Sequence, residues 1–346
     1  MVRVLFLGNL ANVSYLLAHG LSRFHGVDAL LLQKLCDANA MERDVLYGFR
    51  SGNPYQVNLK AWYSGSGARA IAGVSKWFLA ESRQLQADIV HLTGLGSLEM
   101  SLFCRLKRAK LVRHFHGGDL REAGPARLAV QALARESAAL VSTPDLLGLW
   151  PRRSIWLPNP VDPLFFSLKE SEDHSIFVHA PLEPIKRPEV IFAAWARLRQ
   201  LDKEVCLRVS ERGRLAKLYH EKFRTDTRVE WVKLLSRQDT VQVLNKSKVI
   251  WGQHPWAGTF GLSELEGLAC GKPVFAAFDS ARYPSNYCPP VFSSNDPAEI
   301  ARSTDVLLKD SLMRKRIGEK ATKWVTKFHG LENVSLMLRD IYRSVL

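Results

Sequence analysis

The sequence predicts an α/β protein built from two Rossmann-like domains. Its 346 residues exceed the roughly 100–200 residues of a typical single domain. Short runs rich in Val, Ile, Leu and Phe alternate with helix-length amphipathic segments, as in parallel sheets covered by helices. The alternation occurs twice along the chain. Ligands of such sheets bind beyond the carboxyl ends of the strands, so we expect the functional site in an interdomain cleft.

The first predicted domain spans residues 1–166. Its expected strands are Val2–Leu7, Val27–Leu32, Asp88–His91, Leu111–His114 and Ala139–Ser142. The expected helices include Val13–Phe24 and Ser97–Leu106.

The second predicted domain spans residues 174–328 and repeats the pattern. Its expected strands are Ser175–His179, Val205–Val209, Val229–Lys233, Val249–Trp251 and Val274–Ala277. The proline-rich stretch Leu157–Phe166 and the charged stretch Lys169–His174 precede it, which is typical of a domain boundary.

Composition indicates an ordinary soluble globular protein, with 47% hydrophobic and 24% charged residues. No apolar run approaches the roughly 20 residues of a membrane-spanning helix, and the N-terminus reads as a strand and not as a signal peptide. We therefore expect a cytoplasmic protein. The five cysteines (Cys36, Cys104, Cys206, Cys270 and Cys288) are scattered, so we expect them reduced and mostly buried, without a disulfide framework or a metal site.

A net charge of +14 favours an anionic partner, which is a phosphorylated ligand, an acidic membrane surface or nucleic acid. The predicted helix Lys309–Lys327 is especially basic, carrying Arg314, Lys315, Arg316, Lys320, Lys323 and Lys327. This helix presents either a solvated face or a face attracted to anionic lipid at the inner membrane surface. Nucleic acid is the least favoured partner, because no nucleic-acid module is recognisable.

The stretch Gly258–Val274 combines a glycine loop with a helix that carries two carboxylates. Helical periodicity puts Glu266 at the edge of the apolar face beside small residues, where its carboxylate can accept two hydrogen bonds from a vicinal diol. It puts Glu264 on another side, and we expect that residue to be solvated. The helix N-terminus suits a phosphate. Alternatively, the stretch is a capped helix with Glu266 in a structural salt bridge.

The segment F-G-L-S-E-L-E-G-L-A-C-G-K-P-V (residues 260–274) resembles the family 4 glycosyltransferases of GT-B fold, also called glycosyltransferase group 1. Four further stretches look like landmarks of that family in the right order: residues 88–91, 113–120, 157–162 and 184–198. The resemblance implies that Glu266 binds the ribose of a nucleotide-sugar donor, and that Phe260, Gly261 and Leu262 form the donor loop. It also implies that residues 329–346 form a helix packed back on the first domain.

Two positions depart from the family pattern. Gly258 stands where the family has a first glutamate that contacts the donor sugar, and Pro181 stands where it has an arginine that grips the diphosphate. Lys186, the expected catalytic cation, remains, and Arg187 is a candidate substitute for the lost arginine. Without a metal, departure of the diphosphate depends on such fixed positive charge. Arg212 and Arg214 either add to that charge or form an exposed turn.

Further candidates line the expected donor and acceptor sides. His254 is a candidate replacement for the lost sugar contact, while Trp256 either stacks on a base or sugar or, as we favour, packs in the interdomain groove. In the first domain, His116 matches the family's histidine that faces the transferred sugar, and we expect it to be catalytic. His114 is the alternative match. Asp119 positions that histidine or caps a helix, and Asn9 and Asn12 bind acceptor hydroxyls or cap the helix Val13–Phe24.

These observations predict a glycosyltransferase. The resemblance implies transfer from a nucleotide-sugar to a glycan, lipid or small-molecule acceptor, with retention of configuration and without a metal or other cofactor. The alternative is a GT-B protein with weak or no turnover that binds a nucleotide or glycan as the partner of an active transferase.

Overall fold

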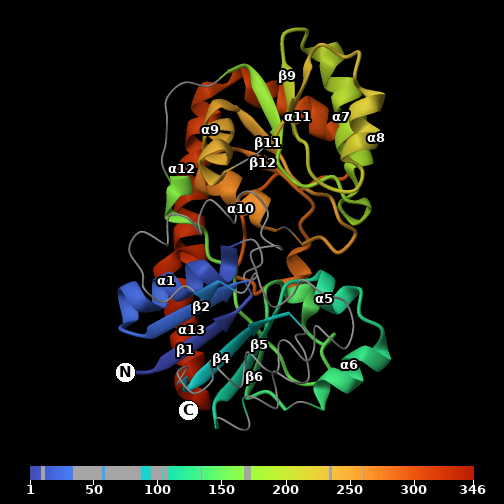
Figure 1. The fold of residues 1–346 in the computed structure, drawn as a ribbon. Helices are drawn as coiled ribbons and strands as arrows, with labels where there is room; N and C mark the ends of the chain where they lie inside the picture. Colours follow the sequence, from blue (N-terminus) through green and yellow to red (C-terminus); the bar gives the residue numbers. More distant parts are fainter. Residues whose placement is uncertain are drawn as a thin grey trace. The chain divides into compact units, whose positions relative to one another are not determined.

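The computed structural model describes residues 1–8, 12–33, 57–58, 87–94, 104, 108–133, 135–166, 173–233, 236–259 and 261–346. These residues form two compact units (Figure 1). Unit 1 comprises Met1–Pro160 and Leu331–Leu346, and unit 2 comprises Val161–Gly330. Each unit contains its own sheet, so each is described by itself.

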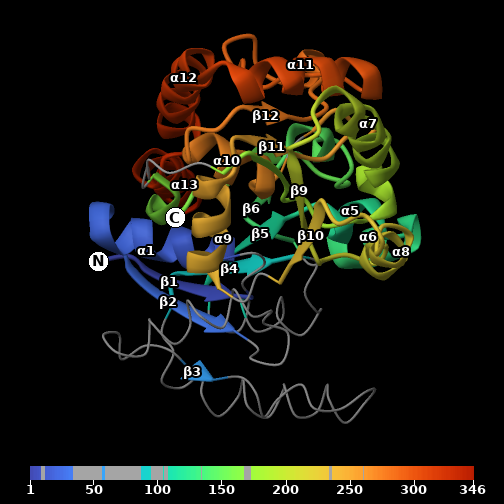
Figure 2. The ribbon, with the colours of Figure 1, turned by 90° about the horizontal axis from the view of Figure 1, so that it is seen from above.

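Unit 1 contains a parallel sheet with strand order β3-β2-β1-β4-β5-β6-β7. The strands are β1 (Arg3–Leu7), β2 (Asp28–Gln33), β3 (Val57–Asn58), β4 (Ile89–Thr93), β5 (Lys110–Phe115), β6 (Ala138–Val141) and β7 (Ile155–Trp156). The five predicted strands of this domain are present, with ends shifted by one or two residues. The edge strands β3, visible in Figure 2, and β7 were not predicted, because two residues show no periodicity.

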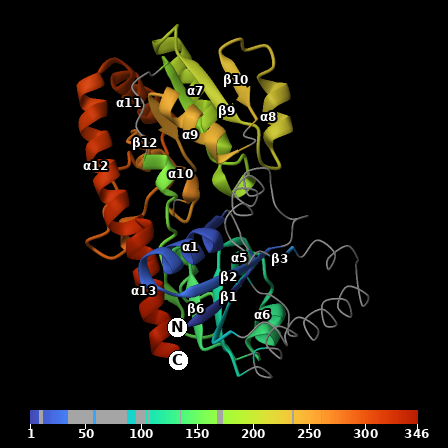
Figure 3. The same cartoon turned by 60° about the vertical axis from the view of Figure 1, so that its left-hand side comes forward.

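Helices cover both faces of this sheet. Helix α1 (Val13–His25) packs beside the C-terminal helix α13 (Leu331–Val345), as Figure 3 shows. Val334, Leu338 and Tyr342 are buried at four-residue spacing, which gives α13 one inward face. On the other face, α5 (Gly118–Arg121) and α6 (Pro125–Ala132) enclose a cluster around Phe115 and Trp150. The 3₁₀ turn η2 (Pro144–Leu146) follows β6. The predicted helix 97–106 lies outside the described residues except for Cys104.

Unit 2 contains a parallel sheet with strand order β10-β9-β8-β11-β12. The strands are β8 (Ser175–Val178), β9 (Cys206–Ser210), β10 (Val229–Val232), β11 (Val249–Trp251) and β12 (Val274–Phe275), and all five were predicted. In both units the strand order reverses beside the first strand of the unit. Such a reversal opens a crevice at the carboxyl ends of the two strands that flank it. These strands are β1 and β4 in unit 1, and β8 and β11 in unit 2.

The helices of unit 2 divide between the two faces of its sheet (Figure 1). Helices α7 (Pro188–Leu201), α8 (Ala216–Lys222) and α11 (Pro297–Lys309) enclose a core cluster around Trp195 and Trp251. Helices α9 (Arg237–Lys246), α10 (Leu262–Ala269) and α12 (Ser311–His329) lie on the other face. The 3₁₀ turns are η3 (Pro163–Phe166), η4 (Pro184–Lys186) and η5 (Ser280–Arg282). The predicted basic helix is α12, whose N-terminus is capped by Asp310.

Four of the five cysteines are described, and all four are free thiols. Cys104 and Cys270 are buried as expected, but Cys206 and Cys288 are exposed, so the expectation of mostly buried cysteines is wrong for these two. Both belong to unit 2. Within the described ranges, no helix has the length and apolar character needed to cross a membrane.

Candidate active site

The candidate donor site lies at the strand reversal of unit 2. His179 follows β8 directly, and the loop after β11 leads into α10, which carries Glu266. Glu266 Oε2 lies 2.6 Å from His179 Nε2, and Glu266 Oε1 lies 3.5 Å from Arg237 Nη2. All three side chains are nearly buried. We call His179, Arg237 and Glu266 the charged cluster.

Arg237 is held in place from a second direction. Its Nε donates to Asp162 Oδ2 over 2.9 Å, and its guanidinium lies 4.8 Å from the centre of the Phe165 ring. Arg237 is the first residue of α9, whose capping box uses Ser236 and Asp239. The helix cap therefore fixes the position from which Arg237 reaches Glu266. The sequence analysis did not identify His179 or Arg237 as site residues. His179 could have been found, because it stands at the end of a predicted strand beside the point where the strand order reverses.

Protonation states follow from the contacts. Burial alone would raise the pKa of Glu266, but the hydrogen bond and charge of His179 and the charges of Arg237 and Arg212 hold that pKa below its usual value. Burial lowers the pKa of His179, against the influence of Glu266. The pair is therefore an ionised carboxylate accepting a hydrogen bond from a neutral imidazole. A carboxylate has about four lone-pair sites, so Glu266 retains acceptor capacity for a ligand.

Arg212 lies beside this pair. Its Nη2 donates to the His179 carbonyl over 2.8 Å, and its Nε donates to Ser210 Oγ over 2.8 Å. The alternative of an exposed turn is wrong for Arg212, because the arginine reaches back across the end of β9. It fits Arg214, which is largely exposed and pairs with Glu183 over 2.6 Å.

Lys186 and Arg187 follow β8 at the turn η4. The Lys186 charge lowers the pKa of both His179 and Glu264. Arg187 adopts a left-handed backbone conformation (φ 53°) and pairs with Glu189 over 3.3 Å. Its guanidinium lies 3.6 Å from the centre of the Trp256 ring. Trp256 is 81% exposed, and its ring stacks on Arg187.

His254 connects the β11 loop to this turn. Its backbone N–H donates to the Lys186 carbonyl over 3.0 Å. The imidazole is fully buried, and burial lowers the pKa of His254 to about 4 despite contacts with Asn295 and the Ser294 backbone. Gly261 and Leu262 form the start of α10, and Phe260 lies outside the described residues.

The expectation that Glu264 is solvated is wrong. Glu264 is fully buried, and its two carboxylate oxygens accept hydrogen bonds from the backbone of Gln253 (2.9 Å) and Gly261 (2.7 Å). Burial raises the pKa of Glu264. A Cβ at Gly252 would lie 2.5 Å from a carboxylate oxygen of Glu264, so only glycine admits this approach. Helical periodicity could not predict the burial of Glu264, because the loop after β11, and not the helix itself, covers that side of α10.

Gly258 has a positive φ of 60°, and its carbonyl accepts a hydrogen bond from the Asp279 backbone over 2.8 Å. A Cβ at this position would lie 2.5 Å from Asp279 Cβ and 2.8 Å from Asp279 N. Glycine is therefore required here by the local backbone. The loop at Gly258 therefore has no space for the glutamate side chain expected at this position from the family pattern.

In unit 1, the strand reversal carries three histidines. His91 on β4 and His114 on β5 point to the same face of the sheet, with His91 Nε2 3.3 Å from His114 Nδ1. The ring of His116, just beyond β5, lies 4.2 Å from that of His114, measured between centres. Burial lowers the pKa of His91 to about 3 and of His116 to about 4, and holds that of His114 well below its usual value. We call these three neutral residues the histidine stack.

Other first-domain candidates lie nearby. Both carboxylate oxygens of Asp119 accept a hydrogen bond from the His116 backbone N–H at 3.1 Å, so Asp119 holds the main chain of that histidine. Asn12 occupies the N-cap position of α1 with a left-handed backbone, but its side chain makes no capping hydrogen bond. The capping alternative is therefore wrong for Asn12. Asn9 lies outside the described residues.

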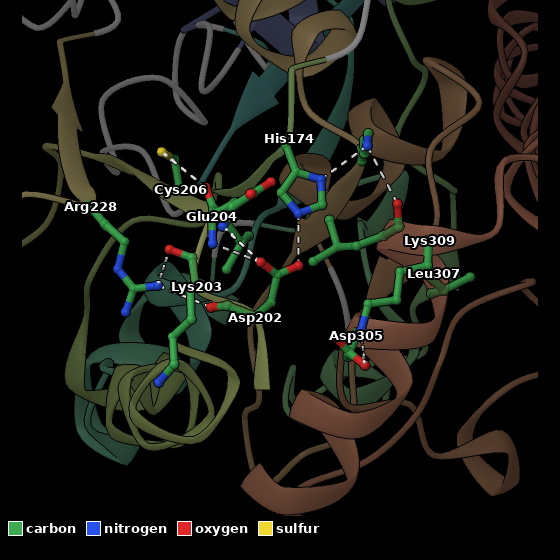
Figure 4. Close-up of polar contacts among 12 residues, drawn as sticks. His174, Asp202, Lys203, Glu204, Cys206, Arg228, Asp305, Leu307 and Lys309 are labelled. Atoms are coloured by element: carbon green, nitrogen blue, oxygen red, sulfur yellow. Dashed lines mark hydrogen bonds and ion pairs between the residues drawn. The ribbon is translucent and has the colours of Figure 1, made fainter. Parts of the chain in front are cut away.

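The opposite, amino edge of the unit 2 sheet holds a different polar group (Figure 4). There His174 Nε2 lies 2.7 Å from Asp202 Oδ2, and His174 Nδ1 lies 3.1 Å from Lys248 Nζ. Asp202 also accepts backbone hydrogen bonds from Glu204 and Val205. These contacts tie together the segments that enter β8, β9 and β11. An acid, a histidine and a further polar group in a row resemble a catalytic triad. However, ligands of parallel sheets bind at the carboxyl ends of the strands, so we interpret these contacts at the amino edge as structural.

The distribution of acidic and histidine side chains bears on metal binding. Within the described part of the chain, no three or more His, Cys, Asp or Glu residues gather in a way that could hold a metal ion. The positive charges of Arg237 and Arg212 act on Glu266, and that of Lys186 acts on its neighbour His179.

Comparison with known proteins agrees with the resemblance seen in the sequence. Residues 163–324, which is nearly all of unit 2, match the family described as glycosyl transferases group 1. A search of curated proteins gives no significant match. In fold, the chain is similar to Anabaena Alr3699/HepE, solved in complex with UDP-glucose, with a TM-score of 0.75 and 15% identity over 99% of this chain and 100% of that one.

Two other solved structures share the fold. Sucrose-phosphate synthase from Thermosynechococcus elongatus has a TM-score of 0.71 and 13% identity over 100% of this chain and 99% of that one. A glycosyltransferase from Rickettsia africae has a TM-score of 0.69 and 12% identity over 99% and 98%. Family match and fold together define the protein as a glycosyltransferase of GT-B fold. The match of residues 163–324 to glycosyl transferases group 1 confirms the resemblance predicted from residues 260–274.

Proposed function

We propose that the protein transfers a sugar from a nucleotide-sugar donor to a glycan, lipid or small-molecule acceptor, with retention of configuration and without a metal ion. The observation that carries this proposal is the charged cluster. A buried, ionised carboxylate stands at a strand reversal, held by a neutral histidine and an arginine. Such a carboxylate suits the two hydroxyls of a ribose.

The diphosphate would be held by fixed cations and by the N-terminus of α10. Lys186 lies near His179 and Glu264, and Arg212 crosses the end of β9. Arg187 stands next in the chain, braced against Trp256. As the glycosidic bond breaks, negative charge develops on the leaving phosphate oxygen, and positive groups fixed beforehand stabilise that charge without reorganising. Lys186 is the proposed catalytic cation, and Pro181 leaves it without the family's second base.

The acceptor hydroxyl would lose its proton to the departing phosphate on the same face of the sugar, which yields retention. His116 is the proposed acceptor-side group, since its backbone is fixed by Asp119 and its ring is neutral. A neutral imidazole can donate to or accept from a hydroxyl. His114 lies directly behind it and is fully buried, so His116 is the better placed of the two.

The second candidate function is a nucleotide- or glycan-binding protein with little or no turnover. The geometry of Gly258 favours it, because the loop excludes any side chain that could replace the family's first glutamate at that position. Pro181 favours it as well. Loss of one hydrogen bond to a charged group corresponds to roughly 1.5–3 kcal/mol, or one to two orders of magnitude in turnover.

Release of nucleoside diphosphate by the purified protein, measured over a panel of UDP-, GDP- and ADP-sugars with and without EDTA, tests the proposal. UDP-glucose goes first, because Alr3699/HepE is described in complex with it. We expect release from one donor, unaffected by EDTA. No release from any donor, together with thermal stabilisation by a free nucleotide, would support the binding protein instead.

We further propose that α12 gives the protein a peripheral contact with anionic membranes at the cytoplasmic face. Lys315, Arg316, Lys320, Lys323 and Lys327 are exposed, and Leu312 is 69% exposed beside them. Arg314 is different: it is buried and donates to the carbonyls of Leu307 and Leu308. Cosedimentation with vesicles containing anionic lipid tests this contact. We expect binding that weakens as salt rises and disappears when Lys320 and Lys323 are both changed to Glu.

A further inference from the structure

The histidine stack connects to a residue of the C-terminal helix. The Tyr342 hydroxyl on α13 lies 2.6 Å from His91 Nδ1, and His91 Nε2 lies 3.3 Å from His114 Nδ1. Tyr342, His91 and His114 are all nearly or fully buried. A chain of hydrogen bonds therefore runs from α13 through β4 to β5, inside unit 1, and ends beside the ring of His116.

The direction of this chain can be deduced from its ends. Each neutral histidine carries one ring proton. If Tyr342 donates to His91 Nδ1, then His91 donates from Nε2 to His114 Nδ1, and the proton of His114 is on Nε2. In this direction, the one ring or hydroxyl proton of Tyr342, His91 and His114 that has no partner among the described residues is the proton on His114 Nε2.

The reverse direction is less favourable. His91 would donate to the Tyr342 oxygen, and the buried hydroxyl proton of Tyr342 would have no described acceptor. His114 Nε2 would again lack a partner. The reverse direction thus leaves two buried polar groups unsatisfied instead of one, and unsatisfied buried groups are the costlier part of any hydrogen-bond balance.

We propose that Tyr342 is a positioning residue that acts through His91 to fix His114 as the Nε2–H tautomer next to His116. The ring of His116, 4.2 Å away between centres, then lies beside one defined tautomer of His114 instead of a mixture. The consequence is a fixed electrostatic environment for the acceptor-side imidazole of His116 when it meets a substrate hydroxyl. This last step rests on the proposed function of His116, whereas the tautomer of His114 does not.

Nitrogen-15 NMR of the histidine side chains tests the proposal without any substrate, because the two ring nitrogens differ in chemical shift between tautomers. Assignment uses His91→Gln and His114→Gln variants. In the wild-type protein we expect the Nε2–H tautomer for both His91 and His114. A Nδ1–H tautomer at His114 in the wild-type spectrum would overturn the proposal, whether or not any variant folds.

The variant Tyr342→Phe removes the hydroxyl and keeps the ring. We expect His114 to change to mixed tautomers, and kcat to fall about tenfold while the Kd for nucleotide stays within about twofold. The matched control is Tyr287→Phe, since the Tyr287 hydroxyl makes an equally short 2.6 Å contact with His329 Nε2 in unit 2.

The control variant should leave the His114 tautomer and kcat unchanged. An unaltered His114 spectrum in Tyr342→Phe would refute the relay. A changed spectrum in a protein that shows no transfer with any donor would leave the relay intact and refute the proposed function instead.

Discussion

The histidine stack of unit 1 and the charged cluster of unit 2 both lie at a strand reversal, yet they handle burial in opposite ways. In unit 1, three imidazoles lie together, and among the described residues no carboxylate bonds to any of their rings, so burial keeps them neutral. In unit 2, the carboxylate of Glu266 and the guanidinium of Arg237 stabilise each other, so charge persists under equal burial. The buried histidines of unit 1 have no opposite charge to offset burial, whereas Glu266 stays ionised because the His179 hydrogen bond and the charges of Arg237 and Arg212 outweigh burial.

The two sites are therefore suited to different parts of the substrates. Ionised Glu266 is suited to grip hydroxyls of a charged donor, and the neutral stack is suited to orient an uncharged hydroxyl of an acceptor. Each of three experiments tests one side of this comparison.

The largest effect is expected for Glu266→Ala. It removes the carboxylate that would hold the ribose and leaves Arg237 without its partner. Two hydrogen bonds to a charged group correspond to about a hundredfold loss in nucleotide affinity. Calorimetry measures this Kd, and Tyr287→Phe serves as a control for a general loss of stability. Unchanged affinity would mean that the charged cluster is purely structural.

A smaller effect is expected for Gly258→Glu, which restores the family's first glutamate in sequence. Because φ is positive and Asp279 occupies the space, we expect a loss of about 2 kcal/mol in the free energy of unfolding and no gain in turnover. Chemical denaturation measures the stability, with Gly258→Ala as the control that adds only the Cβ. Increased turnover in Gly258→Glu would show that the loop can rearrange, and that the missing carboxylate limits the enzyme.

The smallest effect, taken per pH unit, is the response of stability to pH. The pKa of His91 is about 3 in the folded protein, against an ordinary value of 6.5. The unfolded chain therefore binds a proton that the folded chain does not, and stability should fall as pH falls below 6.5. One such histidine contributes a slope of about 1.4 kcal/mol per pH unit. Denaturation between pH 6.5 and 4 measures this slope.

His91→Gln should reduce the slope of unfolding free energy against pH by the contribution of one histidine. His220→Gln, at an exposed histidine, controls for the loss of an imidazole. An unchanged slope in His91→Gln would mean that His91 is already charged. Glu266 acts later in the titration: since its folded pKa is lowered, its contribution is present above about 4.5 and is lost as pH falls through the folded value.

The fold was predictable to a large extent, because hydrophobic periodicity is a local signal. Runs such as Leu111–His114 and Val249–Trp251 are long enough and apolar enough to appear as strands. The two-residue strands β3 and β7 gave no such signal. Glu266 was identified through the motif around it, yet its partners His179 and Arg237 come from distant segments.

By itself, the sequence determined the two α/β units, the glycosyltransferase motif with Glu266, and the excess of positive charge. Side-chain periodicity and motif spacing are properties of the chain alone. Only the tertiary structure decided which side chains are buried and beside what: Glu264 under the β11 loop, Gly258 against Asp279, and Trp256 on Arg187. Burial and pairing set charge states and hydrogen bonds, and both depend on segments that meet only when the chain folds.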